Sequence, residues 1–135
     1  MRMTKSQTLT GTVEAPARAR DFCARVLGDV LTEGALAVDV VDRVTLIASE
    51  LVTNAVTAGS ERIVLELTLD AGEIRLAVCD EAAGDATPLS PGPRQDHGRG
   101  LQMVARASSS WGVDYGPTMK NVWAVVPVPR EVLRT

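Results

Sequence analysis

The sequence predicts an α+β two-layer sandwich, in which a mainly antiparallel mixed sheet packs against three helices. The apolar pattern runs from a first strand to two consecutive helices, then to two strands, a long irregular stretch, another helix and two closing strands. Helices that follow one another, instead of alternating with single strands, favour one helical layer on such a sheet. The length of 135 residues suits one core, so we expect a single domain over residues 1–135.

Composition and charge narrow the class of protein. Hydrophobic residues make up 45% of the chain and aromatic residues 3%, which predicts a core of Val, Leu, Ile and Ala. The net charge of −3 argues against direct binding to DNA or RNA, which requires a basic face. The chain has no run of about 18 apolar residues that would span a membrane, and its start lacks the apolar segment of a signal peptide. We therefore expect a cytoplasmic protein without a membrane contact.

The first 60 residues predict an edge strand and two helices. Residues 5–14 alternate loosely, and Pro16 suits the first turn of a helix over residues 16–31. A second helix is expected over residues 37–58, ended by Gly59, because glycine readily takes the left-handed conformation that follows a helix. The apolar stripe of this second helix is Val40, Val44, Ile47, Leu51, Ala55 and Ala58.

An antiparallel hairpin is predicted next. In residues 62–70 every second residue is apolar, whereas Glu66 and Thr68 point to the opposite face. A short turn leads into a second strand over residues 73–80, whose apolar residues also alternate. The two strands therefore form a half-buried pair.

A stretch without periodicity follows. Residues 81–97 are rich in Pro, Gly, Ala and Asp, and a loop of this length in a small domain is usually functional or disordered. A helix is predicted to start at Gly98, and strands over residues 109–115 and 121–128 close the chain. The inward residues expected in this helix are Leu101, Val104 and Ala105.

The cysteines do not predict a metal site. Cys23 and Cys79 form no C-x-x-C pair, and the chain has one histidine, His97. We expect two buried or half-buried free thiols.

Glu50 and Asn54 are the first candidates for chemistry. They lie four positions apart in a predicted helix, so both side chains leave one face about one turn apart, away from the apolar stripe. An amide oxygen is a suitable ligand for Mg²⁺, and a carboxylate near a hydroxyl can act as a general base. The alternative is the solvated polar face of an amphipathic helix, which the helix pattern leaves open.

Two further candidates follow along the chain. Asp80 ends a strand, where it would accept a hydrogen bond from an amino group such as that of adenine, or simply begin a turn. Gly98 and Gly100 flank Arg99 at a predicted helix start, which suits a phosphate but also suits a plain entry from loop to helix. In this order, the clusters describe a lid that closes on a nucleotide whose phosphates and Mg²⁺ meet the polar helix face.

These stretches resemble the motifs of the GHKL (Bergerat-fold) ATPase superfamily. SELVTNAV, residues 49–56, looks like the N-box, VCD at residues 78–80 resembles the start of the G1 box, and HGRGLQMV at residues 97–104 resembles the G2 box. The branch that the chain resembles most is the histidine kinase-like ATP-binding proteins that act as anti-sigma factor serine/threonine kinases. The resemblance in order and spacing spans nearly the whole chain.

The resemblance implies a histidine kinase-like ATPase domain that binds ATP with Mg²⁺ and carries an ATP-lid loop at about residues 82–99. It implies Asn54 as the metal ligand, Glu50 as the catalytic base and Asp80 as the acceptor for the adenine amine. The residues that it implies around the phosphates are Gly98, Arg99, Gly100 and Leu101.

The resemblance also implies partners. A protein of this branch holds a sigma factor and releases it on binding and phosphorylating a serine of an anti-anti-sigma (STAS-type) protein. Such proteins often dimerise, so a homodimer is a further expectation.

Three positions depart from the pattern of the resembled proteins. The glycines after Asp80 are displaced, as Gly84 shows; Ala58 stands where a basic residue or His is common, and Asn121 where Thr is common. These departures support an alternative function, a non-enzymatic module that sequesters a protein partner and binds nucleotide weakly or not at all.

Overall fold

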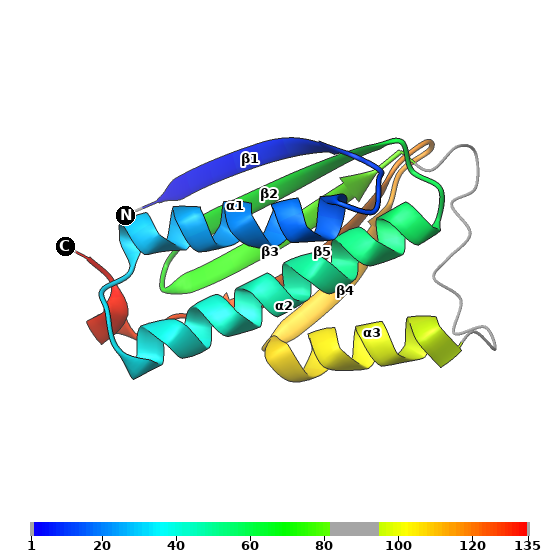
Figure 1. The fold of residues 1–135 in the computed structure, drawn as a ribbon. Coiled ribbons are helices and arrows are strands. Elements are labelled where there is room, and N and C mark those ends of the chain that lie inside the picture. Colours follow the sequence, from blue (N-terminus) through cyan, green and yellow to red (C-terminus); the bar gives the residue numbers. More distant parts are fainter. Residues whose placement is uncertain (1, 82–94, 135) are drawn as a thin grey trace.

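In the part of the chain that the structure describes, three helices cover one face of an open five-stranded sheet (Figure 1). The computed structural model describes residues 2–81 and 95–134, and of residues 95–99 the backbone alone. The strand order is β1-β2-β3-β5-β4, and every pairing among the described strands is antiparallel. The predicted α+β sandwich is therefore confirmed. The strands are β1 (Met3–Thr10), β2 (Arg62–Asp70), β3 (Glu73–Asp80), β4 (Ser110–Tyr115) and β5 (Lys120–Pro127).

The helices form in the predicted order, with small shifts at their ends. They are α1 (Ala15–Val30), α2 (Ala35–Thr57) and α3 (Gln95–Ala107), and a single 3₁₀ turn, η1 (Arg130–Val132), follows the last strand. None of the described helices is long and apolar enough to cross a membrane.

The end of α2 has the hydrogen bonds of a Schellman motif. The Gly59 N–H donates to the Val56 carbonyl, and the Ser60 N–H donates to the Ala55 carbonyl. Gly59 has φ of 88°, as the sequence predicted for the residue after this helix. Ala58 is exposed, so its place in the predicted apolar stripe is wrong: the helix ends at Thr57, and the chain turns away from the core there.

Helix α3 begins three residues earlier than predicted, at Gln95. Gly98 and Gly100 therefore lie inside the first turns of the helix and not at its entrance. Val104 is buried as expected and Leu101 is half-buried, but Ala105 is exposed. The buried partner of Val104 is Ala107, three residues further on, because the stripe that faces the molecule follows an i, i+3 spacing here.

The period of two along β2, β3 and β5 places one apolar face against the helices. Ile63, Leu65, Leu67 and Leu69 of β2 are all at most 2% exposed. On β5 the buried residues are Lys120, Val122, Ala124 and Val126. Lys120 is the one charged residue in this otherwise apolar series. It lies opposite Asp80 in the β3–β5 register.

Both cysteines are free, as predicted. Cys23 is fully buried on α1, and Cys79 is half-buried on β3. Burial raises the pKa of the Cys23 thiol from its ordinary value of 9.0 to about 12, because the thiolate would lose its hydration.

Gly11 lies where the backbone after β1 meets the end of α2, and it is the first position at which we predict the effect of a substitution. Its N–H donates to the Glu61 carbonyl, and a Cβ there would lie 1.7 Å from the Ser60 carbonyl oxygen. Gly11→Ala should destabilise the fold by about 1–3 kcal/mol through overpacking. Gly28→Ala is the matched control: the space around Gly28 on α1 is open, so this change should stabilise by about 0.5–1 kcal/mol. Urea unfolding that gives both changes the same sign would contradict this prediction.

The buried Cys23 thiol predicts a loss of stability in alkali. Between pH 9 and pH 12 the unfolded chain has released the Cys23 proton while the folded chain retains it. The free energy of unfolding should then fall by about 1.4 kcal/mol per pH unit relative to Cys23→Ala, which cannot titrate. Chemical unfolding of both proteins at several pH values measures the difference. Parallel pH profiles would show that the folded protein does not suppress ionisation of this thiol.

Candidate functional site

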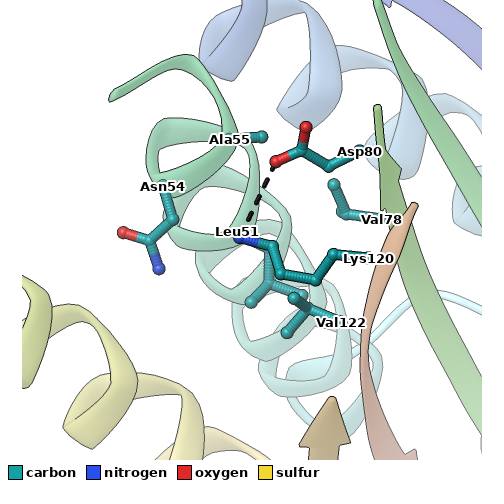
Figure 2. A pocket seen from close by; sticks show the side chains of 7 residues that line it. All are labelled: Leu51, Asn54, Ala55, Val78, Asp80, Lys120 and Val122. Carbon is teal, nitrogen blue, oxygen red and sulfur yellow. Dashed lines mark ion pairs between the residues drawn. The ribbon is translucent and has the colours of Figure 1, made fainter. Parts of the chain in front are cut away.

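A pocket opens where β3 and β5 pass beneath the C-terminal half of α2 (Figure 2). It is small and partly open to solvent. Its walls are apolar on both sides, and three polar side chains reach it. The lining residues are Leu51, Asn54, Ala55, Val78, Asp80, Lys120 and Val122.

Two periodicities bring these side chains together. Leu51 and Ala55 belong to the buried stripe of α2, and Asn54 lies beside that stripe on the same turn. Asp80 ends β3 on the same face as Val78, so it is turned towards the helices and is 1% exposed. The sequence predicted that Asp80 ends a strand, and the structure adds that this residue lines a pocket that Asn54 also lines.

Lys120 is the pocket residue that the sequence analysis missed. Its Nζ lies 3.8 Å from Oδ2 of Asp80, and the two side chains are 10% and 1% exposed (Figure 2). The predicted last strand, residues 121–128, began one residue too late. Starting the strand at Lys120 places Lys120 in phase with Val122 and turns Asn121 to the opposite face. That alternation is the signal that could have found Lys120.

Glu50 and Asn54 meet helix α3 at Gly100. A Cβ at Gly100 would lie 2.9 Å from Oε2 of Glu50 and 3.8 Å from Oδ1 of Asn54. Gly100 is buried, and Glu50 and Asn54 are half-buried, so this side of α2 is not a simple solvated face. Among the described residues, no hydrogen-bond partner reaches the buried Nδ2 of Asn54. Two side-chain oxygens therefore approach one small space that any side chain at Gly100 would fill.

The structure describes some of the remaining predicted site residues but not the predicted lid. Gly98 and Arg99 lie in the first turns of α3, one turn or less from Gly100, and Leu101 follows it half-buried. Residues 82–94 of the predicted lid lie outside the described residues. The structure therefore groups Glu50, Asn54 and Gly100 in one place, and Asn54 and Asp80 in the adjoining pocket.

The end of β3 is negatively charged. Burial raises the pKa of the Cys79 thiol, and the carboxylates of Glu81 and Asp80 raise it further. Lys120 supplies a positive charge next to the Asp80 carboxylate.

The donor set fits a cation that takes few protein ligands. No group of three His, Cys, Asp or Glu side chains gathers within the described parts of the chain. Mg²⁺ can take one or two protein oxygens and complete its shell with phosphates and water. Oδ1 of Asn54 is an oxygen of this kind at the site.

Comparison with known proteins places this geometry in a family. Residues 12–126 match the family model of the histidine kinase-like ATPase domain. No curated protein matches the sequence. Among solved structures, the RsbU and RsbW domains of Rv1364c from Mycobacterium tuberculosis align with 98% of this chain at 19% identity and a TM-score of 0.70. This chain spans 33% of that one, and at such identity the likeness shows a shared fold. Because the family match covers most of the chain, the protein belongs to the histidine kinase-like ATPase domain family.

Proposed function

We propose that the protein is an ATP-binding anti-sigma factor with serine kinase activity toward a STAS-type anti-anti-sigma protein. The observation that carries this proposal is the approach of the Glu50 and Asn54 side-chain oxygens to Gly100, beside the pocket that holds Asp80. Membership of an ATPase family supports ATP as the ligand. The RsbW domain in the similar solved structure supports the partner-switching context.

The pocket would hold the adenine base. Asp80 would accept a hydrogen bond from the exocyclic amine, since a carboxylate is an acceptor. Leu51, Ala55 and Val122 offer apolar contact to the faces of the ring. The phosphates would then extend past Asn54 towards Gly100, where the missing side chain leaves room, with Arg99 within one residue.

Asn54 would hold Mg²⁺ through Oδ1, and Mg²⁺ would supply the neutralisation of charge that phosphoryl transfer requires. Glu50 would act as the base. As the serine oxygen forms a bond to the γ-phosphorus, the bond to the bridging oxygen of ADP breaks, and the serine proton passes to the Glu50 carboxylate. Glu50 is half-buried beside Gly100 of α3, and this position would put its carboxylate close to the phosphates.

Which protein partner is bound would depend on whether ATP or ADP occupies the site. If the ATP-bound and ADP-bound forms bind the sigma factor and the STAS-type protein with different affinities, phosphorylation shifts the population from one complex to the other. The homodimer and the cytoplasmic location stay predictions.

A second candidate function is a non-enzymatic module that sequesters a protein. The observation that favours it is the ion pair of Lys120 and Asp80, because the carboxylate that would accept a hydrogen bond from a base already has a charged neighbour within the protein. The exposed Ala58 at the end of α2 also departs from the basic residue or His that is common in the resembled proteins. In this case nucleotide would bind weakly or not at all.

The base assignment predicts the effect of Glu50→Gln. This variant should bind Mg-ATP like the parent but phosphorylate a STAS-type protein at least about 100-fold more slowly, since it cannot accept the serine proton. Transfer of labelled γ-phosphate in a single turnover measures the step. Glu66→Gln, which removes an exposed carboxylate on the opposite face of the sheet, is the control and should behave as the parent. Equal rates for Glu50→Gln and the parent would exclude Glu50 as the base.

The metal-ligand assignment predicts the effect of Asn54→Ala. Isothermal titration should show Mg-ATP binding weakened at least about tenfold, which corresponds to about 1.4 kcal/mol. In EDTA the variant and the parent should bind ATP with similar affinity, because the lost contact is to the metal. Thr53→Ala, at an exposed neighbouring position of α2, is the control. If the parent shows no binding to ATP or ADP at millimolar concentration, the non-enzymatic module is the better description.

A further inference from the structure

We propose that Lys120 determines base specificity by donating a hydrogen bond to ring nitrogen N1 of adenine while Asp80 accepts one from the 6-amino group. This inference rests on the proposed function, because it concerns the base of the same nucleotide. It assigns a binding role to a residue of β5 that was not among the predicted site residues.

The position of Lys120 is unusual for a lysine. It is 8% exposed, whereas lysine is among the residues most rarely buried. Removing an ammonium group from water costs several kcal/mol even in a relaxed protein. The side chain nevertheless points into the pocket from the first residue of β5, on the face that is otherwise apolar.

The charge of Asp80 explains why the Lys120 ammonium is tolerated there. Asp80 does not, however, take up all the N–H donors of that ammonium. The two residues are cross-strand partners, and their charges attract each other across 3.8 Å. That separation exceeds the distance of a hydrogen bond between nitrogen and oxygen. An ammonium group has three N–H donors, so Lys120 can still donate to a group that enters the pocket.

The pair presents an acceptor beside a donor. The Watson–Crick edge of adenine presents the reverse, an amino donor beside the N1 acceptor. A carboxylate alone would meet only the amine, whereas the carboxylate and the ammonium together would meet both atoms of the edge. A site with buried polar groups that need both partners rejects a base that lacks one of them. If Lys120 served only to neutralise Asp80, the affinity would not depend on N1.

The test compares ADP with 1-deaza-ADP, in which C–H replaces N1, by isothermal titration. For the parent, 1-deaza-ADP should bind about 10- to 100-fold more weakly, the range for a hydrogen bond to a charged group. For Lys120→Met the two ligands should bind equally, and for Lys120→Gln, whose amide still donates, the ratio should be intermediate. Because each ratio is taken on one protein, a change in stability that affects both ligands cancels. Lys5→Met, on an exposed position of β1, should keep the ratio of the parent.

Two results would overturn the inference while leaving the proposed function in place. One is a parent that binds ADP and 1-deaza-ADP equally, a measurement that needs no variant to fold. The other is a ratio that stays the same in Lys120→Met or Lys120→Gln as in the parent. A parent that binds neither ligand would overturn the proposed function, and this inference with it.

Discussion

The packing of α2 across β3 and β5 is the constraint on which the rest of the structure depends. Leu51 and Ala55 are buried against the strands, and this contact fixes the rotation of the helix about its axis. Once that rotation is set, Asn54 must lie at the rim of the pocket, because it precedes Ala55 by one residue, or about 100° of helix rotation. Glu50, one turn earlier, must lie beside it and meet α3. The polar site is therefore positioned by apolar contacts.

The same packing places charge inside an apolar layer. Asp80 and Lys120 continue the buried faces of β3 and β5, where neighbouring positions hold Val78 and Val122. A buried ion pair is weak evidence of stability, since the cost of desolvation can exceed the attraction between the charges. Apolar residues would suit this position at least as well for folding alone. A buried pair of opposite charges at a pocket is therefore suited to a polar ligand, and the family to which the chain belongs is one of ATPase domains.

Gly100 has a structural role that the glycine pattern did not predict. The glycine pattern indicated a phosphate site at a helix entrance, but α3 already begins at Gln95. What the glycine provides is close approach: with no Cβ, the backbone of α3 comes near the Glu50 carboxylate and the Asn54 amide. The environment of the polar side chains of α2 thus depends on a helix more than 40 residues away in the chain.

The sequence by itself determined the order of the described α-helices and strands, the apolar stripe of α2 up to Ala55, and the position of Asp80 at the end of a strand. These features follow from apolar periodicities of two and about 3.6 residues, which can be recognised within a single segment of the sequence. Only the tertiary structure decided that Lys120 lies opposite Asp80, that Ala107 replaces Ala105 in the contact of α3, and that Gly100 meets Glu50. Each of these depends on which segment lies next to which, and a pattern within one segment cannot specify its neighbour across the sheet or the helical layer.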